Sequence, residues 1–351
     1  MKYAWLAALA AVAVLVPAGA QTAPKLIDCT CYDLFLVSPS GRGEGHLLSR
    51  GGGRNLFDVS ADRRKILYST RIWELHASSV RGRYKRLLAK SSTFEIRNAR
   101  WSPNGKWVFY ESDSAACSGE GTEARVVDRD GDGDHAIGCS AYLIAWGSDS
   151  RRVAYGQYVA PGRPNNGGMR LIVANRDGSG QHVVAEQPYI TQVQWSPRGD
   201  WIAYAALNHT GASIHLVRPD GSRDVRIARG AVATWAPGGR RLAVEWSPRN
   251  APGTRLSVLN VDTRRVRILD RRTTDPYRQG VGWSPDGRSI VYRRVAKPKC
   301  DVCRMALYTT PISKPHARRI LTGDPREEFG PLYWLPNDKH ILYTSYIQNG
   351  V

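Results

Sequence analysis

The sequence predicts an all-β fold, a single β-propeller of seven four-stranded blades, on three observations. A tryptophan followed by a tight turn and a strand-forming stretch recurs along the 351 residues. The recurrences are 40 to 51 residues apart, which is the length of one propeller blade. The strands expected before the first recurrence and after the last one would complete each other as a further blade.

Each recurrence has the composition of a β-hairpin. Trp-Ser-Pro-x-Gly occupies residues 101–105, 195–199 and 283–287, and each copy is followed by a stretch that ends in tyrosine, at Tyr110, Tyr204 and Tyr292. Proline presets the backbone of a turn, glycine accepts positive φ, and Val, Ile and Tyr favour strands. Weaker copies begin at the positions Trp146, Trp235 and Trp334, and a seventh has Val59 in the tryptophan place. The regular place of the Trp and Tyr residues indicates core packing rather than ligand binding.

The two ends of the repeat region predict how the ring closes. Residues 34–37 and 46–48 have the composition of third and fourth strands, and residues 332–346 supply a first and a second strand. Together they make one blade, and a closed ring has no exposed sheet edge at which chains could aggregate. Six blades is the alternative if the copy at Val59 does not form a blade.

These motifs resemble the unit W-S-P-D-G-x-x-I-A-Y of the TolB-like, WD-repeat-like propeller family. The resemblance extends from Asp33 to Ile347. It implies the propeller without the N-terminal α/β domain that TolB carries, because few residues precede the first expected strand. The family includes binding proteins and propellers attached to peptidases, so the resemblance implies a fold and not one activity.

The N-terminus has the pattern of an export signal. Met1-Lys2 is followed by an apolar run of 13 residues, 4–16, and by Ala18-Gly19-Ala20, which matches a cleavage site. The run is shorter than the ~20 residues of a membrane-spanning helix, and no later run approaches that length. We therefore expect a signal peptide at 1–20 and a propeller domain at 21–351, located in the periplasm or outside the cell. A retained N-terminal anchor is the alternative.

Six cysteines in an exported chain favour disulfide bonds over free thiols. In the blade scheme, Cys117 and Cys139 lie in loops on the same face of one blade and are the favoured pair. Cys300 and Cys303 lie in the corresponding loop of the sixth blade, next to Cys29 and Cys31 in the closing blade, where they would pin the N-terminus. Zinc bound by these four thiolates and a redox-active Cys300-x-x-Cys303 are the alternatives.

The sequence contains no linear catalytic motif. A nucleophile elbow (G-x-S-x-G), a zinc-protease H-E-x-x-H and a P-loop are all absent. Asp128, Asp130 and Asp132 have the alternate spacing of calcium ligands, but position twelve of such a loop is Cys139 rather than glutamate. We therefore expect a hairpin turn there, no metal and no cofactor, with calcium as the minor alternative.

The formal net charge of +19 would draw the protein to anionic surfaces. Basic residues gather at 81–86, 264–272, 293–299 and 318–319, which are expected on solvated blade edges. Nucleic acid is not expected as a partner, because export separates the chain from DNA and no recognition module is present.

The first strand of each blade is expected to line a central channel. The residues that precede each tryptophan place would then stand at its mouth; the candidates are Asn98, Arg100, Gln192, Arg278 and Gln279, with Arg229, Glu327 and Glu328 at neighbouring places. The long loops at 112–123, 160–169 and 296–303 would share one face, which is the expected recognition surface.

This arrangement predicts an exported, monomeric, non-enzymatic propeller that binds a protein or peptide. The alternatives are an extracytoplasmic hydrolase or lyase with its active site in the channel, and a module that binds an anionic polymer of the cell surface.

Overall fold

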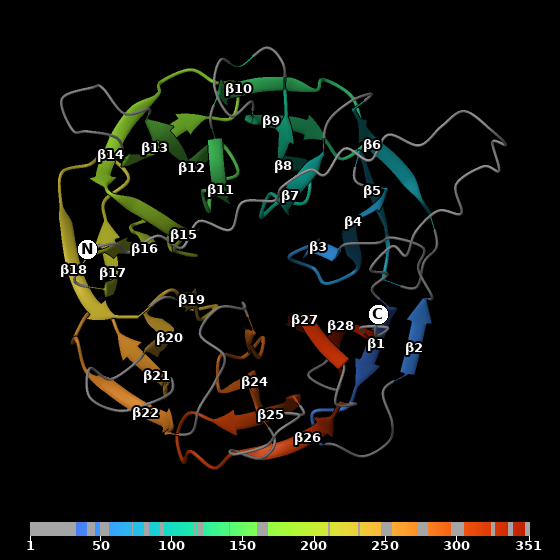
Figure 1. Cartoon of the computed structure of the whole chain (residues 1–351), viewed down its shortest axis with the longest axis vertical. Coiled ribbons are helices and arrows are strands. Elements are labelled where there is room, and N and C mark those ends of the chain that lie inside the picture. The colour runs from blue at the N-terminus through green and yellow to red at the C-terminus, as the bar shows by residue number, and fades with distance from the viewer. Residues whose placement is uncertain are drawn as a thin grey trace, which may run out of the picture.

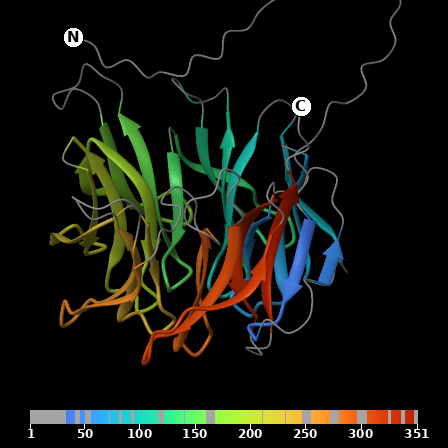
Figure 2. The ribbon, with the colours of Figure 1, turned by 60° about the horizontal axis from the view of Figure 1, so that its bottom comes forward.

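The computed structural model describes residues 33–40, 46–49, 56–71, 73–80, 84–91, 95–114, 117, 122–139, 141–159, 168–209, 211–230, 232–246, 255–271, 280–295, 305–323, 327–335 and 340–347. In this part of the chain all regular structure is β, and its 28 strands form seven four-stranded sheets. The sheets stand around a common centre as the blades of a propeller (Figure 1). Figures 1 and 2 show that the inner strands stand along the axis of the ring, whereas outer strands such as β22 and β26 turn towards its circumference. The predicted fold class and blade count are confirmed.

Six blades are each built from four consecutive strands, and we number them 1 to 6 from the N-terminal side. Blades 1 to 3 comprise β3 (Leu56–Val59), β4 (Lys65–Arg71), β5 (Glu74–Ser79), β6 (Arg86–Lys90), β7 (Ile96–Trp101), β8 (Trp107–Asp113), β9 (Thr122–Asp128), β10 (His135–Cys139), β11 (Ala141–Trp146), β12 (Arg152–Val159), β13 (Gly168–Asn175) and β14 (His182–Gln187). Blades 4 to 6 comprise β15 (Tyr189–Trp195), β16 (Ile202–Asn208), β17 (Gly211–Val217), β18 (Asp224–Arg229), β19 (Val232–Trp235), β20 (Arg241–Trp246), β21 (Arg255–Asn260), β22 (Val266–Asp270), β23 (Val281–Trp283), β24 (Ser289–Val295), β25 (Met305–Pro311) and β26 (Arg318–Thr322).

Blade 7 is shared by the two ends of the chain. Its strands are β27 (Glu327–Trp334), β28 (Ile341–Ile347), β1 (Asp33–Val37) and β2 (His46–Ser49), in this order from the centre outwards. β1 pairs with β28 in antiparallel register, from Asp33 opposite Ser345 to Val37 opposite Ile341. The predicted closure of the ring is therefore confirmed.

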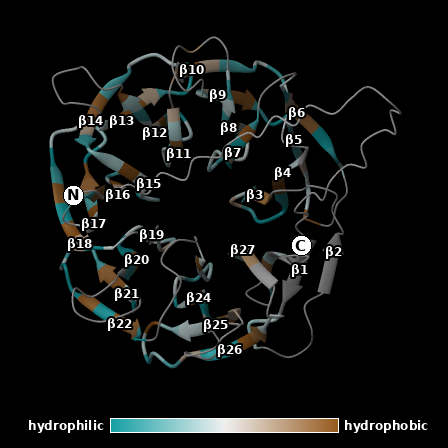
Figure 3. Cartoon of the chain, in the orientation of Figure 1, coloured by the Kyte–Doolittle hydropathy of each residue, from teal (hydrophilic) through white to brown (hydrophobic). Residues whose placement is uncertain are grey.

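The apolar core is divided among the blade interfaces. The buried residues of the described chain form seven clusters, and each cluster joins two neighbouring blades. Brown and teal alternate along outer strands such as β18 and β22 (Figure 3), as expected where one side of a strand faces the next blade and the other faces water. In the cluster between blades 7 and 1, Val59 stands at the place of the repeated tryptophan.

The repeated tryptophans also join the blades through hydrogen bonds. The indole Nε1 of Trp283 donates to the carbonyl of Thr234, 3.1 Å away in the preceding blade. Trp146 and Trp235 make the same bond to the carbonyls of Arg100 and Gln194. In each case the acceptor is the residue just before the tryptophan of the preceding blade, so the equivalent place of the tryptophan in each blade sets the geometry of these bonds.

A buried carboxylate makes a further link between blades 2 and 3. Glu111 on β8 is 5% exposed and accepts hydrogen bonds from Asn98 Nδ2 at 3.2 Å and from the Ile144 amide of β11 at 3.3 Å. Burial raises the pKa of Glu111 above its ordinary value, and the two bonds oppose this rise only in part.

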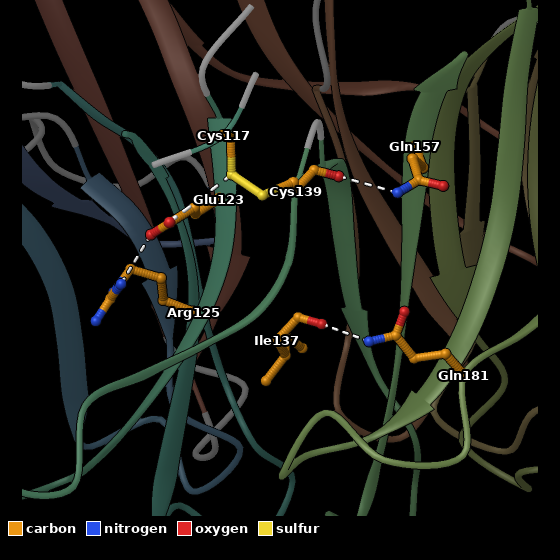
Figure 4. The surroundings of a disulfide bond; sticks show 7 residues. All are labelled: Cys117, Glu123, Arg125, Ile137, Cys139, Gln157 and Gln181. Carbon is orange, nitrogen blue, oxygen red and sulfur yellow. Dashed lines mark hydrogen bonds and ion pairs between the residues drawn. A yellow bond between two sulfur atoms is a disulfide. The ribbon is translucent and has the colours of Figure 1, made fainter. Parts of the chain in front are cut away.

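Blade 2 also contains the disulfide bond between Cys117 and Cys139 that the sequence favoured, with the Cα atoms 5.5 Å apart. Figure 4 shows that the bond lies at the end of the blade next to blade 3. Gln157 Nε2 donates to the Cys139 carbonyl at 3.1 Å, and Gln181 Nε2 donates to the Ile137 carbonyl at 2.7 Å. The bond therefore fixes a strand end against which the next blade is anchored.

The tryptophan bonds predict a difference between two otherwise similar positions. Trp283 and Trp101 are each 6% exposed and each lie below a cation, Arg241 at 5.8 Å and Lys65 at 5.7 Å. Within the described chain the Trp101 indole nitrogen has no partner. Trp283→Phe should therefore lower the free energy of unfolding by about 1 kcal/mol more than Trp101→Phe, because only the first loses a hydrogen bond. Urea unfolding of both variants measures this, and equal losses would contradict a role for the bond.

Glu111 predicts a pH dependence of stability. Since its pKa is raised in the folded state, this group favours folding below its ordinary pKa, and that contribution is lost as the pH rises through the folded-state value. Glu111→Gln keeps the shape and the acceptor oxygen and removes the ionisation. The melting temperature of the variant relative to wild type should rise from acidic to neutral pH and then level off. A constant difference across that range would contradict the raised pKa.

Candidate binding channel

A cavity of about 620 Å³ lies at the centre of the ring. Its described walls come from the innermost strands of all seven blades and from the turns that follow them, so no blade alone forms the site. The polar and charged side chains on these walls are Asp58, Arg63, Asn98, Arg100, Ser102, Ser148, Gln192, Gln194, Ser196, Thr234 and Tyr333.

Irregularities in the inner strands place several of these side chains. The pairing of β3 with β4 shifts between Leu56 and Asp58, and that of β7 with β8 shifts before Asn98. β15 has a similar shift just before Gln192. A bulge adds a residue to one strand and turns the following side chains. In all three strands a polar residue that follows the bulge lines the cavity.

The charged groups of the described walls gather on the side formed by blades 7, 1 and 2. Asp58 accepts a hydrogen bond from the Trp101 amide at 2.9 Å. Arg100 donates to the Phe57 carbonyl at 2.6 Å and to the Ala99 carbonyl at 3.2 Å. Burial raises the pKa of Asp58 above its ordinary value, while the nearby Arg100 guanidinium and the Trp101 bond oppose the rise.

Tyr333 and Arg63 complete this charged side. The Tyr333 hydroxyl donates to the Phe57 carbonyl at 3.3 Å, and the Arg63 guanidinium lies 5.8 Å from the centre of the Tyr333 ring. Burial raises the pKa of Tyr333, so its hydroxyl stays protonated and remains a donor. Two guanidinium groups and one carboxylate leave this side of the cavity with an excess of positive charge.

The opposite side is neutral in its described part. It offers the amides of Gln192 and Gln194 and the hydroxyl of Thr234, beside Val281 and Gly282. Gln194 Oε1 also accepts from the Trp235 amide at 3.3 Å, the same kind of bond that Asp58 makes to Trp101. The cavity therefore has one cationic wall and one wall of neutral hydrogen-bonding groups.

The structure places three of the predicted channel residues on these walls, Asn98, Arg100 and Gln192. Arg278 and Gln279 lie outside the described residues, as do the side chains of Glu327 and Glu328 and most of the three long loops. Arg229 ends the outer strand β18 and does not line the cavity.

Asp58, Arg63 and Tyr333 line the cavity but were not predicted from the sequence. Asp58 and Arg63 belong to the copy that lacks the tryptophan and the turn glycine, whereas Tyr333 stands before an intact tryptophan, Trp334. Arg63 has φ of 58°, in the turn position that Gly105, Gly199 and Gly287 occupy elsewhere. A non-glycine residue in this conformation is strained, and Ser150 has the same conformation, with φ of 58°, at the corresponding place of blade 3.

The acidic turn of blade 2 forms a hairpin. Asp128 Oδ1 accepts from the amides of Asp130 and Asp132, each at 2.8 Å, and Asp130 faces Arg86 at 3.4 Å. Among the described residues, the carboxylates of Asp128, Asp130 and Asp132 do not gather within 4.8 Å of one another. The Asp128 carboxylate thus caps the hairpin turn, and the Asp130 carboxylate pairs with Arg86 and Arg129.

The described residues contain one cluster with the composition of a metal site, and it is Cys117, Cys139 and Glu123. The two sulfurs are joined in the disulfide, which removes them as thiolate ligands. Cys29, Cys31, Cys300 and Cys303 lie outside the described residues. No helix in the described part is long and apolar enough to cross a membrane.

No family model matches the sequence, and no curated protein matches it either. Solved structures do. An oligogalacturonate lyase from Vibrio parahaemolyticus has a TM-score of 0.67 at 12% identity, over 90% of this chain and 97% of the lyase. A TolB from Agrobacterium tumefaciens has a TM-score of 0.54 at 13% identity, over 91% of this chain and 99% of that one.

A puromycin hydrolase matches with a TM-score of 0.60 at 15% identity, and the match covers 89% of this chain but 56% of the hydrolase. Identities this low show the fold alone. The chain has the propeller fold of the TolB proteins, which a lyase and a hydrolase share, and its activity must be argued from its own residues.

Proposed function

We propose that this chain is an exported, non-enzymatic propeller that binds a peptide segment of another protein in its central channel. The observation that carries the proposal is the cavity of about 620 Å³, with a cationic wall at Arg63 and Arg100 and amide and hydroxyl groups opposite. Such a cavity suits an extended segment whose backbone needs both donors and acceptors and whose carboxylate meets the guanidinium groups.

The chemistry of the described walls favours binding over catalysis. A hydrolase or lyase in the channel would need a pair of acid–base groups, such as two carboxylates or a histidine beside a carboxylate. The described walls bring together Asp58 and two arginines, and the Asp58 carboxylate already accepts from the Trp101 amide. The likeness to the lyase and the hydrolase supports the fold and leaves the enzyme as the second candidate.

Two features support export. Residues 1–20 have the pattern of a signal peptide, and Cys117 and Cys139 form a disulfide. Disulfides persist in oxidising compartments such as the periplasm or the medium and are rare in the cytosol.

Export predicts the N-terminus of the mature protein. Expression in the native host should yield a chain that begins at Gln21, found in the periplasm or the medium, which intact-mass measurement of the purified protein checks. A full-length chain that begins at Met1 and stays with the membrane would instead indicate a retained anchor.

The channel predicts where a partner crosslinks. A photoreactive amino acid at Thr234, inside the channel, should capture a discrete protein from the envelope or medium of the host, and the same probe at the exposed Val266 should not. Capture in equal amounts at both positions would contradict the channel as the binding site. Consumption of a candidate substrate by the purified protein would favour the enzyme.

Arg63 and Arg64 provide a matched test of the cationic wall. They are neighbours in one turn and carry the same charge, but only Arg63 lines the cavity, while Arg64 is exposed. Arg63→Gln should weaken binding of the captured partner by about tenfold, because a charge-assisted hydrogen bond is lost. Arg64→Gln should change it by less than about twofold. Titration calorimetry measures both, and equal effects would show that net charge, not the channel, determines affinity.

A further inference from the structure

The outer edges of blades 5 and 6 carry a continuous row of cationic side chains on the face where the hairpin turns lie. We call it the arginine rim, and its members are Arg264, Arg265, Arg267, Lys314, Arg318 and Arg319. All six are exposed. They come from the turn before β22, from β22 itself, from the turn before β26 and from the start of β26.

A direct bond shows that the two halves of the rim belong together. Arg267 Nη2 on β22 donates to the carbonyl of Ser313 at 2.6 Å, and Ser313 lies in the turn that leads into β26. β22 and β26 also follow one another along the outer circumference of the ring (Figure 1). The six side chains therefore form one surface rather than two separate patches.

The charges of the rim are not neutralised in the described structure. In other blades, arginines of the third strand face acids of the outer strand or of the turn before it: Arg170 lies 2.7 Å from Glu186, and Arg125 lies 3.1 Å from Asp134. No ion pair to a described residue involves any member of the rim. Of the described residues near the rim, Asp262 is engaged by Arg240 at 3.8 Å and the buried Asp270 by Arg294 at 2.6 Å.

The same face of the other blades argues against a flat anionic membrane as the partner. Asp177 and Asp220 are exposed in the turns of blades 3 and 4, on the face that carries the rim turns. Hydrogen bonds from Ser179 and Ser222 lower the pKa of Asp177 and Asp220, so both stay charged. A bilayer laid across this face would meet these carboxylates, whereas a narrow chain along blades 5 and 6 would pass the described carboxylates of Asp262 and Asp286, each of which faces an arginine, Arg240 at 3.8 Å and Arg288 at 4.0 Å.

The rim also lacks the aromatic groups on which single-stranded nucleic acids stack. The exposed large aromatics of the described chain are Trp73, Tyr84, Tyr158 and Tyr189, and they belong to blades 1, 3 and 4. Five of the six cations are arginines, whose planar guanidinium groups bind carboxylates through two parallel hydrogen bonds.

We propose that the arginine rim binds a linear acidic polysaccharide through its carboxylate groups. This surface is on the outside of the ring and is independent of the channel. It gives the protein a second binding function, attachment to a polymer of repeated carboxylates, while the channel stays open to its own ligand.

Polygalacturonate is the probe for the test, because its sugars each carry one carboxylate. The full mature protein should bind it at low ionic strength, and binding should weaken as salt screens the charges. The rim variant Arg264→Asn, Arg265→Gln, Arg318→Gln, Arg319→Gln should bind about tenfold more weakly or worse. Asparagine is chosen at position 264 because φ there is 55°, which asparagine tolerates.

The matched control removes four exposed arginines from other blades: Arg64→Gln, Arg151→Gln, Arg198→Gln, Arg223→Gln. It has the same net charge as the rim variant and should bind within about threefold of wild type. Equal losses in the two variants would overturn the proposal, and so would failure of the wild-type protein to bind. Thermal melting checks that each variant is folded. If the fourfold rim variant does not fold, the double variant Arg264→Asn, Arg265→Gln, which changes one turn only, is tested in its place.

Two further probes decide the class of partner. Fully methyl-esterified polygalacturonate has the same backbone without the charges and should not bind. Vesicles that contain anionic phosphatidylglycerol should bind more weakly than polygalacturonate at equal charge concentration. Equal binding of the esterified polymer, or tighter binding of the vesicles, would overturn the assignment to a carboxylate polysaccharide.

Discussion

The structure depends on contacts between neighbouring blades, because no blade has a core of its own. Every buried cluster of the described chain lies at an interface between two sheets, so a blade is stable only while it has a neighbour on each side. The pairing of β1 with β28 completes blade 7, and blade 7 then covers the free faces of blades 1 and 6. Without it, the sheet that starts the ring and the sheet that ends it would each expose an apolar face.

The repeat could be predicted from the sequence because the same physical requirement recurs at each interface. A large apolar side chain must fill the inner edge of each interface, and a tryptophan does so at six of the seven; at Trp146, Trp235 and Trp283 it also reaches a carbonyl of the preceding blade. The disulfide followed from the same scheme, since it placed Cys117 and Cys139 on one face of one blade. Fold, closure and this cysteine pair were thus accessible before any coordinates.

The channel residues were only partly accessible, for a reason that the repeat itself explains. Asn98, Arg100 and Gln192 were found because they stand at regular places before a tryptophan. Asp58 and Arg63 stand where the repeat has lost its tryptophan and its turn glycine, and a pattern search treats such a copy as degraded. The loss of the large side chain at Val59 coincides with the charged wall of the cavity. A departure from the repeat therefore accompanies this wall, although the loss of the turn glycine alone is not specific to it, because Ser150 replaces that glycine in blade 3.

The residues that stabilise the propeller differ from those that can contact a ligand. For this reason the structural similarity to a lyase, a hydrolase and TolB does not indicate which activity this chain has. The positions that hold the blades together are the tryptophans and the strand-two tyrosines, which are almost fully buried, although one edge of each tryptophan also lines the cavity. The positions that can contact a ligand alternate with them along the inner strands or lie on the outer edges, where stability imposes little on their chemistry. Proteins can therefore share the residues that hold the blades together and differ in the residues that contact a ligand. In this chain the residues that can contact a ligand form a cationic wall inside the ring and a row of arginines outside it. These are the features from which its function must be argued.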